Sequence, residues 1–253
     1  MADWRTVPAD LHVHTVGSAC AEAEMIPPLI VGRAVALGLG LIAITDHHSV
    51  ENVRAVGEAA LAHGIRVLPG MEVQTREEVH VLCLFGEPGQ AERWQDMIWE
   101  HLPPEENREE HFGTQVVVDV EGNPLRTNSR LLQTSTSLSF EEVLHLTAEW
   151  GGLALPAHVD RPRFSLFANL GMIPEGVVLP GAEISAHITA EEARSRFPSL
   201  QGVALIQSGD AHRLAEMTDR TRLRVRELTL RGLEKALRRE DGCEVILREG
   251  PDP

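Results

Sequence analysis

More than half of the twelve histidines in this chain lie in short segments that each resemble the end of a buried strand. Two carboxylates, Glu72 and Asp210, lie in similar positions. Imidazole is the commonest metal ligand in proteins, and together with carboxylates it forms the mixed nitrogen and oxygen donor set that Zn, Mn or Fe prefers. The sequence therefore predicts a metalloenzyme. The histidines in these segments are His12, His14, His47, His48, His80, His158 and His212.

The spacing of these residues adds to the signal that their type gives. Alternate side chains of a strand point to the same face, so His12 and His14 can reach one metal ion. An isolated pair of this kind is more often structural, but Asp210 and His212 repeat the spacing after another apolar run. Parallel α/β barrels place their sites at the carboxyl ends of the strands, where nearly all these residues are expected. Convergence of several strand ends on one donor chemistry favours a shared site.

Apolar strand-like runs alternate with amphipathic helical stretches in the first third of the chain. Strands are predicted over residues 9–14 and 41–46, and helices over residues 27–37 and 49–63, the second with Ser49 as its N-cap. Two further strands are predicted over residues 66–73 and 79–85. Continuous apolar strands separated by helices indicate parallel pairing with both faces buried, and hence a barrel or a doubly wound sheet.

Residues 87–137 interrupt this alternation. We interpret them as an insertion that contains a β-hairpin, because a Val-rich run from Gln115 is followed by a Glu-Gly-Asn-Pro turn. The alternation resumes with a helix over residues 139–150, for which Ser139 and Glu142 predict a capping box. The length suits one α/β barrel, so we expect residues 1–253 to form a single domain.

Composition and charge exclude several classes of protein. The formal net charge of −15 argues against binding of long nucleic acid, which requires many phosphates to be neutralised. A small anionic substrate is compatible with it, since metal ions and a few arginines can meet its charge locally. No apolar run approaches the roughly 18 residues of a membrane span, and the amino terminus has no secretory pattern. Three widely spaced cysteines suit reducing surroundings, so we expect a cytoplasmic location.

The ordered set of motifs resembles the PHP family, the polymerase and histidinol phosphatase domain. The resemblance runs from residue 10 to residue 212 and implies a distorted (β/α)7 TIM-like barrel with two or three divalent ions of Zn, Mn or Fe. It also implies hydrolysis of a phosphoester by metal-activated water. The motifs are Asp-Leu-His12-Val-His14-Thr, Ile-Thr-Asp46-His47-His48-Ser, Pro-Gly-Met-Glu72-Val, Val-His80-Val-Leu, Pro-Ala-His158 and Ser-Gly-Asp210-Ala-His212.

The resemblance further implies a role for each donor. One metal would be held by His12, His14, Glu72 and Asp210, and Glu72 would bridge to a second metal held by His80 and His158. His47 and His212 would help to hold a third metal. Where the family has an acidic residue or a histidine to complete that third site, this chain offers Cys20 or Glu22. A thiolate from Cys20 would favour zinc or iron over manganese.

Four other polar residues receive expected roles. His212 or His48 is the candidate acid that protonates the leaving group. Arg161 is either a bidentate phosphate clamp or the partner of Asp160 in a surface ion pair. Asp46 is expected to accept hydrogen bonds behind the ligands and not to bind metal itself. Glu183 ends a predicted strand, so it either faces the site or is structural, and the structural role is the favoured expectation. The histidines outside the motifs are expected to be packed or solvated.

Two classes of function follow. The first is a metal-dependent phosphoesterase acting on a small phosphomonoester, a nucleotide or a short oligonucleotide. The second is a non-catalytic regulatory or interaction module that retains metal. The number of candidate ligands favours the enzyme, because a purely structural site needs only about four ligands per metal. The sequence predicts neither the substrate nor the oligomeric state.

Overall fold

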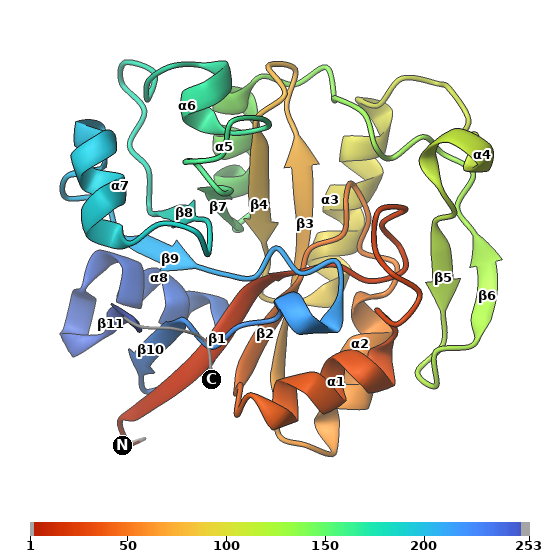
Figure 1. The fold of residues 1–253 in the computed structure, drawn as a ribbon, viewed down its shortest axis with the longest axis horizontal. Helices are drawn as coiled ribbons and strands as arrows, with labels where there is room; N and C mark the ends of the chain where they lie inside the picture. Colours follow the sequence, from red (N-terminus) through yellow and green to blue (C-terminus); the bar gives the residue numbers. More distant parts are fainter. Residues whose placement is uncertain (1–2, 249–253) are drawn as a thin grey trace.

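A curled, mixed seven-stranded sheet forms the centre of the computed structural model, which describes residues 3–248 (Figure 1). The strand order is β11-β10-β1-β2-β3-β4-β7. The strands of this sheet are β1 (Arg5–Val13), β2 (Leu41–Ile44), β3 (Arg66–Gln74), β4 (His80–Leu84), β7 (Leu153–Pro156), β10 (Thr221–Val225) and β11 (Glu244–Leu247). Two smaller sheets pair β5 (Val116–Val118) with β6 (Pro124–Thr127) and β8 (Ala182–Ile184) with β9 (Leu205–Gln207).

Helices follow most of these strands. They are α1 (Pro27–Ala36), α2 (Val53–Leu61), α3 (Pro88–Glu100), α4 (Glu109–Phe112), α5 (Phe140–Glu149), α6 (Leu166–Asn169), α7 (Ala190–Arg196) and α8 (Leu230–Arg238). Short 3-10 turns lie at Pro198–Leu200, Leu214–Glu216 and Glu240–Gly242. No helix within residues 3–248 is long and apolar enough to span a membrane.

The predicted parallel pairing is present in β1, β2 and β3. Both β1 with β2 and β2 with β3 are parallel ladders, and every residue of β2 is buried. Alternate residues of β2 enter different apolar clusters: Leu41 and Ala43 enter one, while Ile42 and Ile44 enter the other. The strand is therefore apolar throughout because both of its faces are covered.

The prediction of parallel pairing was wrong for β4. This strand is antiparallel to both β3 and β7. The connection from β3 is a tight turn, closed by a hydrogen bond of 2.9 Å from the backbone amide of Thr75 to the carbonyl of Val79, with Glu78 in the left-handed region. Such a turn is far too short for a parallel crossover, which needs a dozen or more residues. His80, the first residue of β4, consequently lies at the edge where β3 ends.

The barrel expected from the motifs is present in a partial form. The main sheet curls, and the separate parallel pair of β8 and β9 lies between its ends, with β8 beside β7 and β9 beside β11. The outer strand pairs of β1 with β10 and of β10 with β11 are antiparallel. The architecture is thus an α/β half-barrel of TIM-like form, without the regular βα repeats that the sequence predicted.

Two helix caps show where local sequence was a good guide and where it was not. The capping box of Ser139 and Glu142 is formed at the start of α5, as predicted. The second predicted helix instead begins at Val53, so Ser49 is not its N-cap. The N-cap residue Asn52 donates to the Thr15 hydroxyl at 2.8 Å and accepts from the backbone amide of Val118 at 2.9 Å. Asn52 therefore connects a site loop to the β5–β6 hairpin, and this long-range contact fixes where α2 starts.

The predicted hairpin is present as the antiparallel pair β5 and β6, at the right of the view in Figure 1. Glu51 forms an ion pair with Arg126 of β6 and accepts a hydrogen bond of 2.7 Å from Asn128. The hairpin is therefore fixed to the segment that leads into α2. Its position beside the strand ends makes residues 87–137 part of the surroundings of the site.

The core offers a direct test of this packing. Trp94 of α3 is fully buried against Phe85, with ring centroids 5.6 Å apart. Trp94→Ala should lower the free energy of unfolding by about 3–5 kcal/mol, because it leaves a cavity in a close-packed interior. The matched change Trp4→Ala removes a ring that is 38% exposed and should cost about 1 kcal/mol or less. Denaturant unfolding of the two variants measures the difference; equal losses would contradict the packing.

Candidate metal centre

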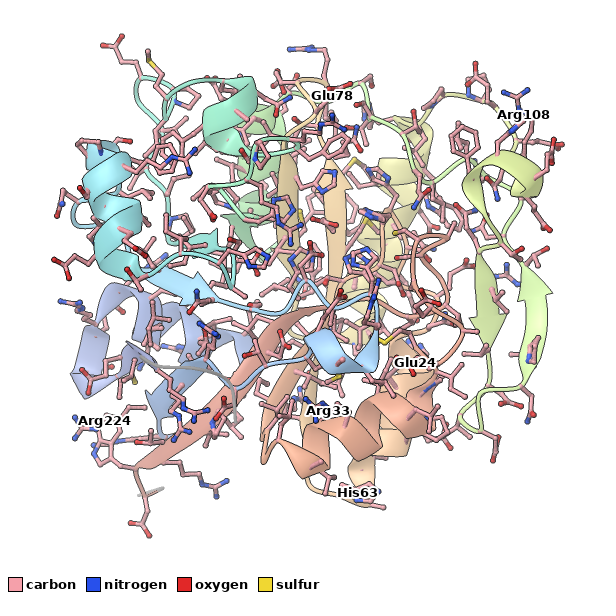
Figure 2. All side chains as sticks on the ribbon, viewed as in Figure 1. Glu24, Arg33, His63, Glu78, Arg108 and Arg224 are labelled. Carbon is pink, nitrogen blue, oxygen red and sulfur yellow. The ribbon has the colours of Figure 1, made fainter. Side chains whose placement is uncertain are left out.

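The residues predicted to bind metal converge at one edge of the sheet. His12 lies near the carboxyl end of β1 with His14 just beyond it, and Glu72 lies in β3. His47, His158 and Asp210 follow β2, β7 and β9 respectively. His80 reaches the same edge from the start of β4, because that strand runs in the opposite direction. Side chains at this edge crowd together at the centre of Figure 2, far from the labelled His63 at the end of α2.

The first group of donors consists of His12, His14, Glu72 and Asp210, all buried. The two Nε2 atoms of the histidines are 3.1 Å apart, and the Asp210 Oδ1 atom lies 3.1 and 3.2 Å from them. Glu72 carboxylate oxygens lie 3.3 Å from His12 Nε2 and 3.4 Å from His14 Nε2. Ligands about 2.1 Å from a tetrahedral zinc are separated by about 3.4 Å, so this spacing fits a metal ion.

Hydrogen bonds behind this group fix the orientation of both imidazoles. His12 Nδ1 lies 2.9 Å from Glu183 Oε2, and His14 Nδ1 lies 2.9 Å from the Ser18 hydroxyl. Ser18 in turn donates to Asp46 at 2.7 Å, so Asp46 accepts hydrogen bonds behind the ligands, as expected. Such contacts select the ring nitrogen that faces a metal and raise its basicity. Glu183 therefore faces the site, which was the less favoured of its two expected positions.

A second group joins Glu72 to His47 and His80, which offer ligand atoms within 4.8 Å of one another. His80 Nδ1 lies 2.8 Å from Glu72 Oε1, and its Nε2 lies 3.2 Å from the Gln74 side-chain oxygen. His158 Nε2 lies 3.2 Å from the same Glu72 Oε1. One carboxylate therefore contacts both groups, in the position that the sequence assigned to a bridging ligand.

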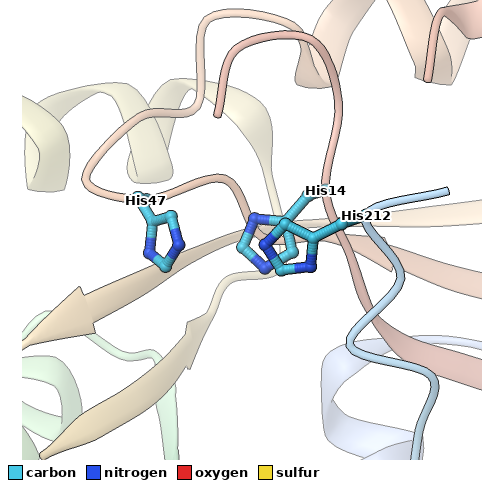
Figure 3. A group of neighbouring side chains, drawn as sticks. All are labelled: His14, His47 and His212. Atoms are coloured by element: carbon cyan, nitrogen blue, oxygen red, sulfur yellow. The ribbon is translucent and has the colours of Figure 1, made fainter. Parts of the chain in front are cut away.

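The third group is formed by His14, His47 and His212 (Figure 3). His14 and His212 are stacked with ring centroids 4.1 Å apart, and His47 approaches them from a separate segment. His212 Nδ1 lies 2.9 Å from the backbone carbonyl of Asp210, which leaves Nε2 as the free ring nitrogen. The sequence assigned His47 and His212 to this site but placed His14 only in the first group.

Neither proposed replacement at the third site joins these groups. Cys20 lines the pocket beside His47 and His212 without belonging to a group of donors. Glu22 is exposed, and its backbone amide donates to the His212 carbonyl at 2.8 Å. The structure thus places Cys20 near the third group and gives no support for Glu22 as a ligand.

Charge at the site favours a bound cation. Burial alone would raise the pKa of Glu72 and of Asp210, but the neighbouring imidazoles outweigh it and hold both values well below their usual range. Burial alone would lower the pKa of His14, yet the neighbouring carboxylates of Asp210 and Glu72 raise it to about 9. The ionised carboxylates of Glu72 and Asp210 are therefore stabilised by positive charge at the point where the histidine nitrogens converge. Divalent cations supply that charge and release the protons.

In the third group, the pKa values of two histidines are lowered instead of raised. Burial lowers the pKa of His47 well below its usual value, and burial with the charge of His14 lowers that of His212 to about 4. Neutral imidazole is the form that binds metal ions. Unsatisfied buried atoms point the same way: Glu72 Oε2, Asp210 Oδ1 and His158 Nδ1 have no hydrogen-bond partner. The residues present therefore fit a cluster of divalent metals.

His48 does not face the pocket, which argues against the acid role expected from the sequence. Its Nδ1 lies 2.6 Å from the Leu132 carbonyl, and its Nε2 accepts from the backbone amide of Gln74 at 2.9 Å. Burial lowers the pKa of His48 to about 4, so the ring is neutral near neutral pH and its single N–H is directed to the Leu132 carbonyl. His48 instead joins residues 129–135 to β3.

Arg161 forms an ion pair with Asp210, and not with Asp160. Asp160 instead accepts hydrogen bonds from the backbone amide and hydroxyl of Ser185, at 2.7 and 2.6 Å. The surface ion pair considered as the alternative is therefore absent. Arg161 is 35% exposed and lines the pocket above the donors, so its guanidinium is accessible to an anion that enters the pocket.

A pocket of about 570 Å³ opens over the donor groups. Its size suits a small ligand, for which pockets of about 300–1,000 Å³ are usual. Gln133 and Phe112 bring residues of the predicted insertion into its wall, and Phe164 enters from the segment before α6. A larger cleft of about 1120 Å³ lies near α5, α7 and α8 and contains none of the expected donors. The sequence did not predict the pocket-lining aromatic residues, since neither lies in a polar motif.

Sequence relatives of the chain include two kinds of phosphoesterase. This chain is 34% identical to the 5'-3' exoribonuclease Rnm of Salmonella typhimurium over 79 residues. The matched segment covers 30% of this chain and 26% of that relative. The chain is 32% identical over 84 residues to the 3',5'-nucleoside bisphosphate phosphatase of Chromobacterium violaceum, covering 32% and 28%. The matches thus span only about a quarter of the length of these relatives.

The fold has a counterpart among solved structures, the lesion-specific endonuclease EndoQ of Pyrococcus furiosus. The similarity covers 98% of this chain and 60% of that one, with a TM-score of 0.73 and 19% sequence identity. A model of the PHP domain family matches residues 10–153, more than half of the chain. That range contains the first motifs on which the resemblance rested, and the structure brings their side chains together. The chain belongs to the PHP domain family.

Proposed function

We propose that this protein is a metal-dependent phosphoesterase that hydrolyses a small phosphomonoester or a nucleotide or short oligonucleotide phosphoester. The observation that supports this most strongly is the presence of three overlapping groups of donors around Glu72 at the floor of an open pocket. A structural metal site closes its coordination shell with about four ligands. This site has more donors than one such shell uses, and it is accessible from solvent.

The assigned ligands draw on these groups and on His158. His12, His14, Glu72 and Asp210 would hold the first metal; Glu72, His80 and His158 would hold the second; and His47 and His212 would contribute to a third. When bound, two or three Zn, Mn or Fe ions polarise the phosphate oxygens and make water a nucleophile near neutral pH.

The chain itself supplies binding and orientation. Arg161 lies at the pocket wall, where its planar guanidinium matches two phosphate oxygens. Its contact with Asp210 sets the direction of that guanidinium toward the donors. His212 has one ring nitrogen directed to a backbone carbonyl and the other free, and its pKa of about 4 keeps it neutral, so it can hold a metal next to the substrate but has no extra proton for the expected acid role.

The relatives narrow the class of substrate. Their activities are those of an exoribonuclease and a nucleoside bisphosphate phosphatase, and both concern phosphoesters of nucleotides. The expectation that long nucleic acid is not a substrate has no support from these relatives. The acidic net charge of −15 still favours a short or terminal segment over extended contact with a strand.

Asp210→Ala tests the proposed activity. Wild type reconstituted with Mn or Zn should release phosphate or nucleotide from a panel of phosphomonoesters, nucleotides and short oligonucleotides. The Asp210 Oδ1 atom contacts the ring nitrogens of both His12 and His14, so removal of this proposed metal ligand should reduce turnover at least about 100-fold. Asp241→Ala, at an exposed carboxylate outside the pocket, is the matched control and should keep full activity.

Two outcomes would contradict the enzyme. Metal bound at full stoichiometry with no turnover of any substrate would favour the non-catalytic regulatory module considered from the sequence. Equal turnover in Asp210→Ala and wild type would show that the chemistry takes place elsewhere.

Glu183→Gln tests how the first metal is held. The neutral amide keeps the shape of the side chain but removes the charge that supports His12, so metal affinity should fall about 10- to 100-fold. Calorimetric titration of metal into the metal-free protein measures this directly, without an activity assay. Glu234→Gln, in the larger cleft near α8, is the matched control. Unchanged affinity in Glu183→Gln would remove the supporting role.

Arg161→Ala tests phosphate binding. The KM for a phosphomonoester should rise about 10- to 100-fold because a charge-assisted bidentate contact is lost. Arg161→Lys retains the charge but not the planar fork, and should recover only part of this loss. Metal content is measured in both variants, because Arg161 also contacts Asp210. Unchanged KM with full metal content would exclude Arg161 as the clamp.

A further inference from the structure

Two aromatic side chains line the pocket above the donors. Phe112 is the last residue of α4, and Phe164 lies just before α6. These two helices flank the upper end of β3 on opposite sides in Figure 1. The pocket therefore has apolar rings on its walls and charged groups on its floor. Hydrolysis of a phosphoester requires the charged groups on the floor of the pocket, but it does not require aromatic side chains on the walls.

Phe164 is held in a costly conformation without being buried. Its φ is +54°, in the left-handed region that bulky side chains avoid, and it is 40% exposed. Packing of the ring into the core therefore does not explain the residue. Strained backbone of this kind concentrates at binding sites, where the surrounding structure over-determines it.

Contacts with β4 fix the position of this ring. The backbone amide of His80 donates to the Phe164 carbonyl at 3.1 Å. The Phe164 ring stacks on the His80 imidazole, with centroids 4.9 Å apart and planes inclined by 20°. A ring that lies flat on one of the donors places its exposed area over the pocket, next to where a phosphoester would bind. It offers a flat platform at a fixed distance from the donors.

We propose that Phe164, together with Phe112, forms a stacking subsite for the nucleobase of the substrate, an inference that rests on the proposed phosphoesterase function. Planar aromatic side chains stack on any base, largely independently of sequence. Arg163 is exposed in the same pocket and supplies a cation for a neighbouring phosphate or for the base itself. The substrate class is then a nucleotide unit, either free or at the end of a single strand, and not a sugar phosphate.

The pocket volume is consistent with one such unit. About 570 Å³ accommodates a nucleotide, and the opening leaves a path for a following chain. Phe112 belongs to the predicted insertion of residues 87–137, so that segment would contribute directly to substrate choice. Its role as part of the subsite also accounts for a half-buried aromatic ring on a four-residue helix.

The test uses Phe164→Leu, which keeps an apolar side chain but loses the flat ring. The metal-loaded protein is assayed for kcat/KM with adenosine 5'-monophosphate, adenosine 3',5'-bisphosphate and ribose 5-phosphate. Wild type should prefer the base-bearing substrates, and the variant should reduce that preference about 5- to 100-fold. Phe112→Leu should reduce it in the same direction. Phe167→Leu, which alters a ring stacked on Phe197 outside the pocket, is the matched control and should keep the preference.

Calorimetric binding separates failure of the subsite from failure of the enzyme. Adenosine 5'-monophosphate should bind the metal-loaded protein more tightly than ribose 5-phosphate, and Phe164→Leu should remove the difference. If this holds without turnover, the subsite stands and the proposed activity fails. Turnover without preference for a base, or a preference unchanged in Phe164→Leu, would overturn the subsite.

A final comparison distinguishes the two sources of the nucleotide unit. Mononucleotides are compared with short single-stranded oligonucleotides that carry the same terminal base. Both should depend on Phe164 if the subsite exists. A higher kcat/KM for the oligonucleotide would assign the site to strand ends, and a higher value for the mononucleotide would assign it to free nucleotides.

Discussion

The buried carboxylate of Glu72 is the interaction on which the site depends. Its two oxygens lie within 3.4 Å of nitrogens from five histidines that come from four strands and their following loops. A buried charge is costly unless it is paired, so this position is stable only when cations or protonated imidazoles surround it. The same requirement agrees with the bridging role proposed for Glu72. Its place within β3, in a ladder with β4, gives it a fixed position that a loop would not.

The residues around Glu72 are held by contacts from distant parts of the chain. Asp10 accepts hydrogen bonds from the backbone amides of Gly209 and Thr218, at 3.0 and 2.9 Å, and so draws the Asp210 segment onto the end of β1. His158 and Asp210 both have positive φ. Strain of this kind is offset by the packed scaffold beneath and turns both side chains toward the centre.

The pocket combines two kinds of surface, each with its own origin. The donors on its floor come from the strand ends, while Phe112 and Gln133 come from the segment that interrupts the βα alternation. The donors and part of the pocket wall thus come from different parts of the chain.

The sequence by itself determined the donor set, the family and the alternation of apolar strands, because residue type and a period of two are local properties. His12 and His14 were correctly expected on one face, and the Ser139 cap was correct because it depends on two residues only three positions apart. Only the tertiary structure decided the antiparallel direction of β4, the inward position of Glu183 and the removal of His48 from the pocket. Each of these depends on which distant segment lies opposite, and no local pattern encodes that choice. The aromatic wall of the pocket belongs to the same class, since Phe112 and Phe164 acquire a shared role only when the chain folds.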